Sequence, residues 1–217
     1  MSAEERYVPA AGLPGLTRFY DSIVAVTMRE RLFRDRLASQ VLKDLPDRAR
    51  IVDLGTGTGT FAIALAAAAP EAEVVGVDGD PEALEIAGRK PGSEAVEWLV
   101  ARAGSLPLGD SSYERVIVSL LLHHLDADGK RAALAECHRV LRPGGRLHIA
   151  DWGAPQDPLM RACLLTLAIF DGYEGIRDHA AGRLPAFVAE AGFAEVRRHD
   201  RLRTVWGSLE LLSAARV

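Results

Sequence analysis

Cysteine, basic charge and long apolar runs are all scarce in this chain of 217 residues. Its two cysteines, Cys137 and Cys163, share no close spacing, which excludes a metal or redox motif and favours small buried hydrophobic residues. The net charge of −4 disfavours a nucleic-acid partner, because such proteins usually carry a basic surplus. No run of about 18 apolar residues occurs and no apolar leader begins the chain, so we expect no membrane span and a cytoplasmic protein.

Residues 1–46 form a segment distinct from the rest of the chain, which we interpret as one main domain over 47–217. Apolar side chains recur at helical spacing between residues 14 and 45, and Pro46 ends this pattern. The N-terminal helical arm is predicted either to pack against the main domain or to act as a lid. Tyr20, an aromatic side chain with a polar tip, is the residue of this arm that we expect near a ligand.

The most informative stretch of the main domain is 51–60, Ile-Val-Asp-Leu-Gly-Thr-Gly-Thr-Gly-Thr. An apolar run over 49–54 predicts a buried strand, and the alanine-rich run over 59–69 predicts a helix. The three glycines between them let the chain turn sharply and let a ligand approach the backbone, because glycine has no Cβ. Strand, glycine turn and helix together predict the first half of a nucleotide-binding βαβ unit.

Strands and helices then alternate along the rest of the chain. Further strands are predicted over 73–78, 96–100, 115–120 and 146–151, and further helices over 81–89, 127–141, 160–170 and 184–191. The Arg-Pro-Gly-Gly sequence at 142–145 predicts an abrupt stop, and a closing strand pair is predicted over 193–200 and 202–214. This alternation predicts an α/β fold whose parallel sheet has helices on both faces.

The glycine turn departs from the pattern of dinucleotide-binding folds. Its spacing is G-x-G-x-G, and Thr60 stands where a third glycine would lie under a pyrophosphate. Asp53 precedes the turn, where it can accept from a ligand amine, and Asp78 ends the next strand, where it can accept from ribose hydroxyls. The turn itself contains no lysine or arginine to meet a phosphate. These features favour a ligand with ammonium and sulfonium cations over one with two phosphates.

Four stretches of the sequence resemble one family, in order and in spacing. They are IVDLGTGTG at 51–59, VVGVDGDPEALEIA at 74–87, LPLGDSSYERVIVSLLLHHL at 106–125 and ECHRVLRPGGRLHIAD at 136–151. The chain resembles the class I S-adenosylmethionine-dependent methyltransferases, most of all the small-molecule branch that includes quinone-ring C-methyltransferases. The resemblance implies a Rossmann-like sheet of seven strands with an antiparallel C-terminal pair, and S-adenosylmethionine as the cofactor.

The resemblance also implies a set of residues that bind the methyl donor. It assigns the methionine part to Asp53, Gly55, Thr56 and Gly57, and the ribose to Asp78 with Gly79 and Asp80 alongside. The further candidates for contact with the donor are Arg102, Ala103, Ser119 and Tyr20. Arg102 stands where an acidic residue is common in the family, so the usual acid–adenine bond is not expected. The backbone of Ala103 can still contact the ring.

The acceptor side is predicted at the same edge of the sheet. His123 and His124 follow the fourth strand and Asp151 ends the fifth, so these three are the candidates for catalysis, with packing or hydrogen bonding as the alternative. Because adjacent side chains diverge, both histidines are not expected to reach one atom, and no metal site is predicted. Residues 152–182 lose the regular pattern and are predicted to cap the acceptor, with His179 exposed.

Methyl transfer from a sulfonium is an in-line displacement, and holding the acceptor in line can supply most of the catalysis. Residues 119–122 are Ser-Leu-Leu-Leu, in place of the Asn/Asp-Pro-Pro-aromatic signature of methyltransferases that act on nucleobase or glutamine amides, which favours a small-molecule acceptor. Three alternatives stay open: a fold member that binds the cofactor without transfer, a fold member that uses the bound cofactor for other chemistry, and a dinucleotide-dependent oxidoreductase, which Thr60 disfavours. The oligomeric state is also open, with a homodimer as one alternative.

Overall fold

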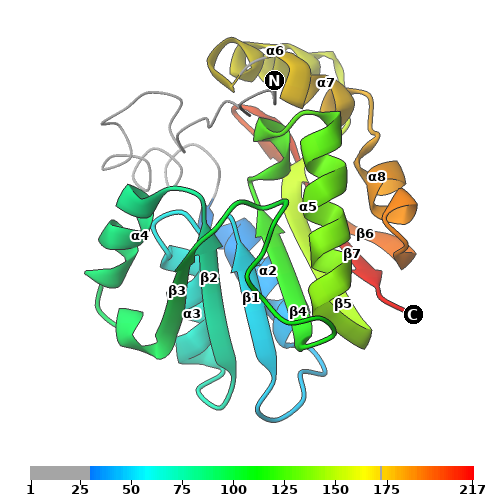
Figure 1. The fold of residues 1–217 in the computed structure, drawn as a ribbon. Coiled ribbons are helices and arrows are strands. Elements are labelled where there is room, and N and C mark those ends of the chain that lie inside the picture. The colour runs from blue at the N-terminus through cyan, green and yellow to red at the C-terminus, as the bar shows by residue number, and fades with distance from the viewer. Residues whose placement is uncertain (1–29, 172) are drawn as a thin grey trace, which may run out of the picture.

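A seven-stranded sheet forms the centre of the computed structural model, which describes residues 30–171 and 173–217. The strands are β1 Arg50–Leu54, β2 Glu73–Asp78, β3 Val96–Val100, β4 Tyr113–Ser119, β5 Leu141–Trp152, β6 Ala194–Thr204 and β7 Gly207–Ala215. Their order is β3-β2-β1-β4-β5-β7-β6 (Figure 1). The first five strands in this order are parallel, and β7 is antiparallel to both of its neighbours. The predicted Rossmann-like sheet with an antiparallel C-terminal pair is therefore confirmed.

The helices described in the structure are α2 Glu30–Leu42, α3 Thr60–Ala68, α4 Pro81–Gly88, α5 Ala127–Val140, α6 Pro158–Asp171, α7 Tyr173–Ala180 and α8 Leu184–Glu190. Two short 3-10 turns, η1 Ser93–Ala95 and η2 Leu122–His124, accompany them. Within the described residues no helix combines the length and the apolar character that a membrane span requires. Of the predicted N-terminal arm, α2 lies in the described part, whereas Tyr20 lies outside it.

Helices cover both faces of the sheet, as the apolar strands predict. Figure 1 shows α5 in front of the sheet and α2 and α3 behind it. Phe33 of α2 and Leu65 of α3 belong to the hydrophobic cluster on one face, and Leu134 of α5 and Phe187 of α8 belong to the cluster on the other. Burying each such side chain contributes roughly 1.5–3 kcal/mol. The two clusters hold the carboxyl ends of the parallel strands in one plane, where the candidate site lies.

The boundary between α5 and β5 differs from the prediction. The expected stop at 142–145 lies inside β5, which begins at Leu141 directly after the helix. Gly144 N donates to Arg216 O at 2.7 Å and Arg216 N donates to Gly145 O at 3.0 Å. The glycines therefore pair with the end of the chain, a long-range contact that local turn signals do not contain.

Two further boundaries were predicted wrongly. The C-terminal strands meet at residues 205–206, where Thr204 Oγ1 accepts from Trp206 N and donates to Gly207 O, and not at Arg201. The segment predicted to lose regular structure contains the helix α7. A Cβ added at Gly175 would lie 1.9 Å from His123 O. This glycine therefore allows α7 to pack closely on η2, and it does not break the helix.

Candidate functional site

The glycine turn between β1 and α3 has three left-handed residues, Gly55, Gly57 and Gly59, with φ of +74°, +55° and +74°. Glycine adopts positive φ angles freely because it has no Cβ, whereas other residues adopt them only with strain. A Cβ at Gly59 would lie 2.4 Å from the ring of Trp98, so that glycine is needed for packing. Among the described residues, a Cβ at Gly57 would meet nothing within 4 Å. Gly57 therefore presents bare backbone to open space, which is what a ligand-binding turn requires.

Asp78 holds this turn from the end of β2. Its Oδ2 accepts from Gly57 N at 2.7 Å and its Oδ1 accepts from Asp80 N at 2.9 Å. Burial raises the pKa of Asp78, and these backbone hydrogen bonds oppose the rise. A carboxylate has about four lone-pair positions, so Asp78 keeps acceptor capacity for ribose hydroxyls. Asp80 itself caps α4 by accepting from Glu82 N at 2.9 Å, as its position before Pro81 predicts.

Asp53 lies beneath the turn and is buried. Its Oδ2 accepts from Thr56 Oγ1 at 2.7 Å. Burial raises the pKa of Asp53 to about 6, although the hydrogen bond from Thr56 opposes this shift. A carboxyl group that titrates near neutral pH ionises more readily when a cation comes close. Asp53 is thus suited to a ligand that carries positive charge.

The predicted adenine and sulfur positions lie around the same turn. Ala101 N donates to Asp78 O at 2.9 Å, which holds the loop carrying Arg102 and Ala103 beside the end of β2. Arg102 is exposed and forms a backbone bridge with Ser105. Ser119 ends β4 and pairs with β5. The residues predicted to bind the donor, as far as the structure describes them, therefore gather at one edge of the sheet.

Three residues of this edge were not predicted from the sequence. Leu121 lies under Gly55, where an added Cβ would come within 2.9 Å of its side chain. Trp98 fills the space beside Gly59 and Gly76. Lys90 reaches the turn from beyond α4 and donates to threonine hydroxyls. Each comes from a distant part of the chain, so the local sequence around the glycines carried no signal of it.

His123 and Asp151 form a buried pair at the ends of β4 and β5. His123 Nδ1 lies 2.8 Å from Asp151 Oδ1, and the carboxylate also accepts from Leu122 N at 2.8 Å and from Trp152 N at 2.7 Å. Burial by itself would raise the pKa of Asp151, but the neighbouring imidazoles and these hydrogen bonds hold it well below its ordinary value. Asp151 therefore stays ionised, and it accepts a hydrogen bond from the Nδ1–H of His123.

Two other histidines surround this pair, and both differ from expectation. His124 does not diverge from His123, because the 3-10 turn η2 places their ring centroids 4.0 Å apart. His179, predicted to be exposed, is fully buried, and its Nδ1 lies 2.6 Å from Trp152 O. Burial lowers the pKa of His179 and brings that of His124 to about 3, so both are neutral. Among the described residues, His179 Nε2, His124 Nδ1 and Trp152 Nε1 have no hydrogen-bond partner.

Lys130 holds α7 in place beside these histidines. Its Nζ donates to Leu125 O at 2.7 Å and to Gly175 O at 2.8 Å, and it lies 3.7 Å from Asp178 Oδ2. Lys130 and Asp178 are both buried, and Arg183 pairs with the same carboxylate at 2.9 Å. Burial lowers the pKa of Lys130, and Asp178 opposes this effect. The cap predicted over 152–182 thus rests on a buried ion pair.

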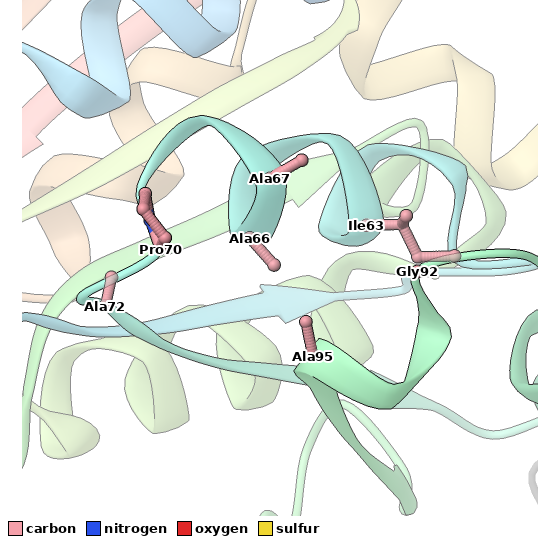
Figure 2. A pocket seen from close by; sticks show the side chains of 7 residues that line it. All are labelled: Ile63, Ala66, Ala67, Pro70, Ala72, Gly92 and Ala95. Carbon is pink, nitrogen blue, oxygen red and sulfur yellow. The ribbon is translucent and has the colours of Figure 1, made fainter.

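A separate apolar groove of about 320 Å³ lies between α3 and η1. Figure 2 shows Ala66 and Ala95 on its opposite sides, with Pro70 and Ala72 at one end and Gly92 at the other. Ala72 immediately precedes β2, so the groove extends to the amino edge of the sheet, away from Asp53 and Asp78. The groove is therefore separate from the residues predicted to bind the donor.

The fold and this edge define a class of protein: an α/β domain built for a nucleoside-bearing cofactor that presents cations. Gly57 borders open space, and Asp78 and Asp53 supply acceptors beside it. The described residues contain no group of three His, Cys, Asp or Glu side chains that could hold a metal ion. The acceptor groups of Asp78 and Asp53 beside the turn therefore fit the ribose and the cationic part of S-adenosylmethionine.

The chain is similar to known proteins in sequence and in fold. A family model described as a methyltransferase domain matches residues 51–145. The ubiquinone/menaquinone biosynthesis C-methyltransferase UbiE of Syntrophotalea carbinolica is 33% identical over 186 residues, which are 77% of this chain and 78% of that protein. UbiE of Desulfotalea psychrophila is 31% identical over 163 residues, covering 71% of this chain. The solved structure of the S-adenosylmethionine-dependent methyltransferase SibL matches 95% of this chain with a TM-score of 0.69 and 26% identity.

The chain belongs to the class I S-adenosylmethionine-dependent methyltransferase family, whose cofactor is S-adenosylmethionine. It spans 65% of the length of the Desulfotalea protein and 60% of SibL. The sequence-based resemblance and the cofactor prediction are confirmed by these matches. The roles of the individual site residues stay predictions.

Proposed function

We propose that this protein transfers the methyl group of S-adenosylmethionine to a small-molecule acceptor. The observation that carries the proposal is the bare backbone of Gly57 flanked by the carboxyl groups of Asp78 and Asp53. When bound, the cofactor would supply the methyl group of its sulfonium. The rest of the cofactor would leave as a neutral thioether. Asp78 binds the ribose hydroxyls and Asp53 faces the cationic end.

The acceptor side of the proposal rests on His123 and its surroundings. Asp151 accepts a hydrogen bond from the Nδ1–H of His123, so the basic nitrogen of this imidazole is Nε2. His123 is thereby suited to take a proton from an acceptor hydroxyl as the methyl group arrives. His179 has the same tautomer, because its Nδ1 donates to Trp152 O. Residues 152–182, including α6 and α7, cap this acceptor, and the net charge of −4 supports a small molecule in preference to nucleic acid.

The experiment has two stages. Calorimetry with S-adenosylhomocysteine tests the donor site, and no binding by the wild-type protein would overturn the proposal. Transfer of a labelled methyl group from S-adenosylmethionine is then measured with hydroquinones, phenols, carboxylic acids and amines as acceptors. Turnover of one class supports the proposal. Donor binding without turnover in any class indicates a binding protein that keeps the fold without transfer.

A further inference from the structure

Lys90 brings a positive charge to the glycine turn from beyond the end of α4. Its Nζ donates to Thr58 Oγ1 at 2.9 Å and to Thr60 Oγ1 at 2.6 Å, although these threonines are 32 and 30 residues away in the sequence. They flank Gly59, the left-handed residue that begins α3. The turn lacks a basic residue in its own sequence, but the tertiary structure supplies one.

The location of this cation is not explained by helix electrostatics. Thr60 is the first residue of α3, and the N-terminus of a helix carries partial positive charge that disfavours a neighbouring cation. Hydrogen bonds from a charged donor contribute more to stability than neutral ones do. Lys90 is half-buried and Thr58 is buried, so their bond is partly shielded from water. The contacts to the turn are therefore one physical reason for the placement of Lys90.

The two sides of the turn are held by opposite charges. Asp78 holds the N–H of Gly57, and Lys90 holds the hydroxyl of the next residue, Thr58. No described residue fills the side of Gly57 on which a Cβ would project. The glycines carry no side chains that could fix their backbone by packing, so polar contacts at the flanks determine the position of the Gly57 peptide.

We propose that Lys90 is a positioning residue for the methyl donor. By holding Thr58 and Thr60 it fixes the Gly57 peptide, and with it the orientation of the Asp78 carboxylate toward the ribose. In this proposal Lys90 acts through Thr58 and Thr60 and not by contact with the reacting atoms. The inference rests on the proposed function, because the ligand that it positions is S-adenosylmethionine.

The primary test compares Lys90→Met with Arg89→Met by calorimetry with S-adenosylhomocysteine. Arg89 is the exposed neighbour, and its ion pair with Glu85 stays on the surface of α4, so it is a matched control. We expect at least tenfold weaker binding by Lys90→Met and a change below twofold for Arg89→Met. Binding by Lys90→Met within twofold of the wild type would overturn the inference. Absence of binding by the wild type would instead contradict the proposed function.

A second set of variants separates positioning from general stability. If Lys90 acts through the two hydroxyls, the triple variant K90M/T58V/T60V should bind no more weakly than K90M, because contacts in one network are not additive. Lys90→Arg keeps donors for both hydroxyls and should bind within about threefold of the wild type. Should K90M fail to fold, T58V/T60V and K90R carry the test. Additive losses, or wild-type affinity in T58V/T60V, would overturn the inference.

Discussion

The backbone N–H of Gly57 donates to Oδ2 of Asp78 at 2.7 Å, so the end of β2 and the glycine turn hold each other in place. This bond occupies only part of the acceptor capacity of the carboxylate. The remaining lone pairs are available to a ligand beside Gly57. The relationship ties the shape of the turn and the recognition of the donor to one side chain, and the first prediction follows from it.

Asp78→Asn should weaken S-adenosylhomocysteine binding by at least tenfold. The amide group has one acceptor oxygen where the carboxylate has two, so hydrogen bonds to the turn and to ribose hydroxyls compete for it. Calorimetry measures the change. Glu82→Gln is the control, because Glu82 is exposed in the first turn of α4, and it should bind within twofold of wild type. Unchanged affinity in Asp78→Asn would contradict the ribose assignment.

Gly57→Ala and Gly59→Ala should have opposite consequences for binding and stability. Both positions have positive φ, which costs a non-glycine residue about 1 kcal/mol. The added methyl group at residue 59 also collides with Trp98 and Ala87, whereas at residue 57 it meets open space. We therefore expect Gly59→Ala to lower the free energy of unfolding by several times more than Gly57→Ala. Gly57→Ala should mainly weaken binding of the methyl donor. Urea unfolding and calorimetry test the pair, and equal stability of the two variants would contradict the packing argument.

Binding of S-adenosylmethionine should depend on pH through Asp53. Its folded-state pKa of about 6 exceeds the ordinary 3.8, so the folded protein holds this proton more tightly than the unfolded chain does. The contribution of Asp53 to stability is therefore complete below about pH 3.8 and is lost as the pH rises through about 6. A cationic donor favours the ionised form, so its affinity should rise roughly tenfold from about pH 5 to about pH 7. Calorimetry at several pH values measures this, and Asp53→Asn should reduce the dependence. An equal slope in Asp53→Asn would show that another group titrates.

His123→Asn and His179→Asn should lower the rate of methyl transfer without weakening the binding of the methyl donor. An asparagine amide can replace the Nδ1 donor toward Asp151 or toward Trp152 O, but it removes the basic Nε2. We expect His123→Asn to reduce kcat by at least about tenfold, since general base catalysis contributes about 10²–10⁴. His179→Asn should chiefly raise the acceptor KM. His138→Asn, on α5 beside Phe193, serves as the control. Full turnover in His123→Asn would exclude a proton-transfer role.

Lys130→Met should destabilise the protein by roughly 3 kcal/mol, because breaking a buried ion pair leaves the partner charge uncompensated. Asp178 would keep only its contact with Arg183, and the carbonyl groups of Leu125 and Gly175 would lose their donor. Urea unfolding measures the loss. Lys43→Met is the comparison, since this exposed lysine should change stability by less than about 0.5 kcal/mol. Similar losses in the two variants would contradict the importance of the buried pair.

The strand–turn–helix around 51–60 and the alternation of strands and helices were predictable, because periodicity and glycine spacing are local properties of the chain. The N-cap of α4 by Asp80 followed from one residue and its neighbour Pro81. The α5–β5 boundary and the helix α7 were not predictable in this way. They depend on pairing with Arg216 and on packing against His123, both distant in sequence.

In the candidate site, too, the features set by local sequence were predictable and those set by packing were not. The acids at 53 and 78 were expected at the donor from their places at strand ends, and both lie at the carboxyl edge beside the glycine turn. The burial of His179 was missed, because exposure depends on the packing of α7 and not on the residue type. Lys90 was also missed, since a search for a basic residue within the turn does not extend to the segment after α4.

By itself the sequence determined the βαβ beginning of the domain, its family resemblance and the acidic character of the donor turn, because these follow from short spacings that survive without knowledge of contacts. Only the tertiary structure decided which side chains converge from separate elements: Lys90 on the threonines, Asp151 on His123, and His179 on Trp152. The physical reason is that hydrogen bonds act over a few ångströms in space, and the strands and helices that carry these residues lie tens of residues apart along the chain.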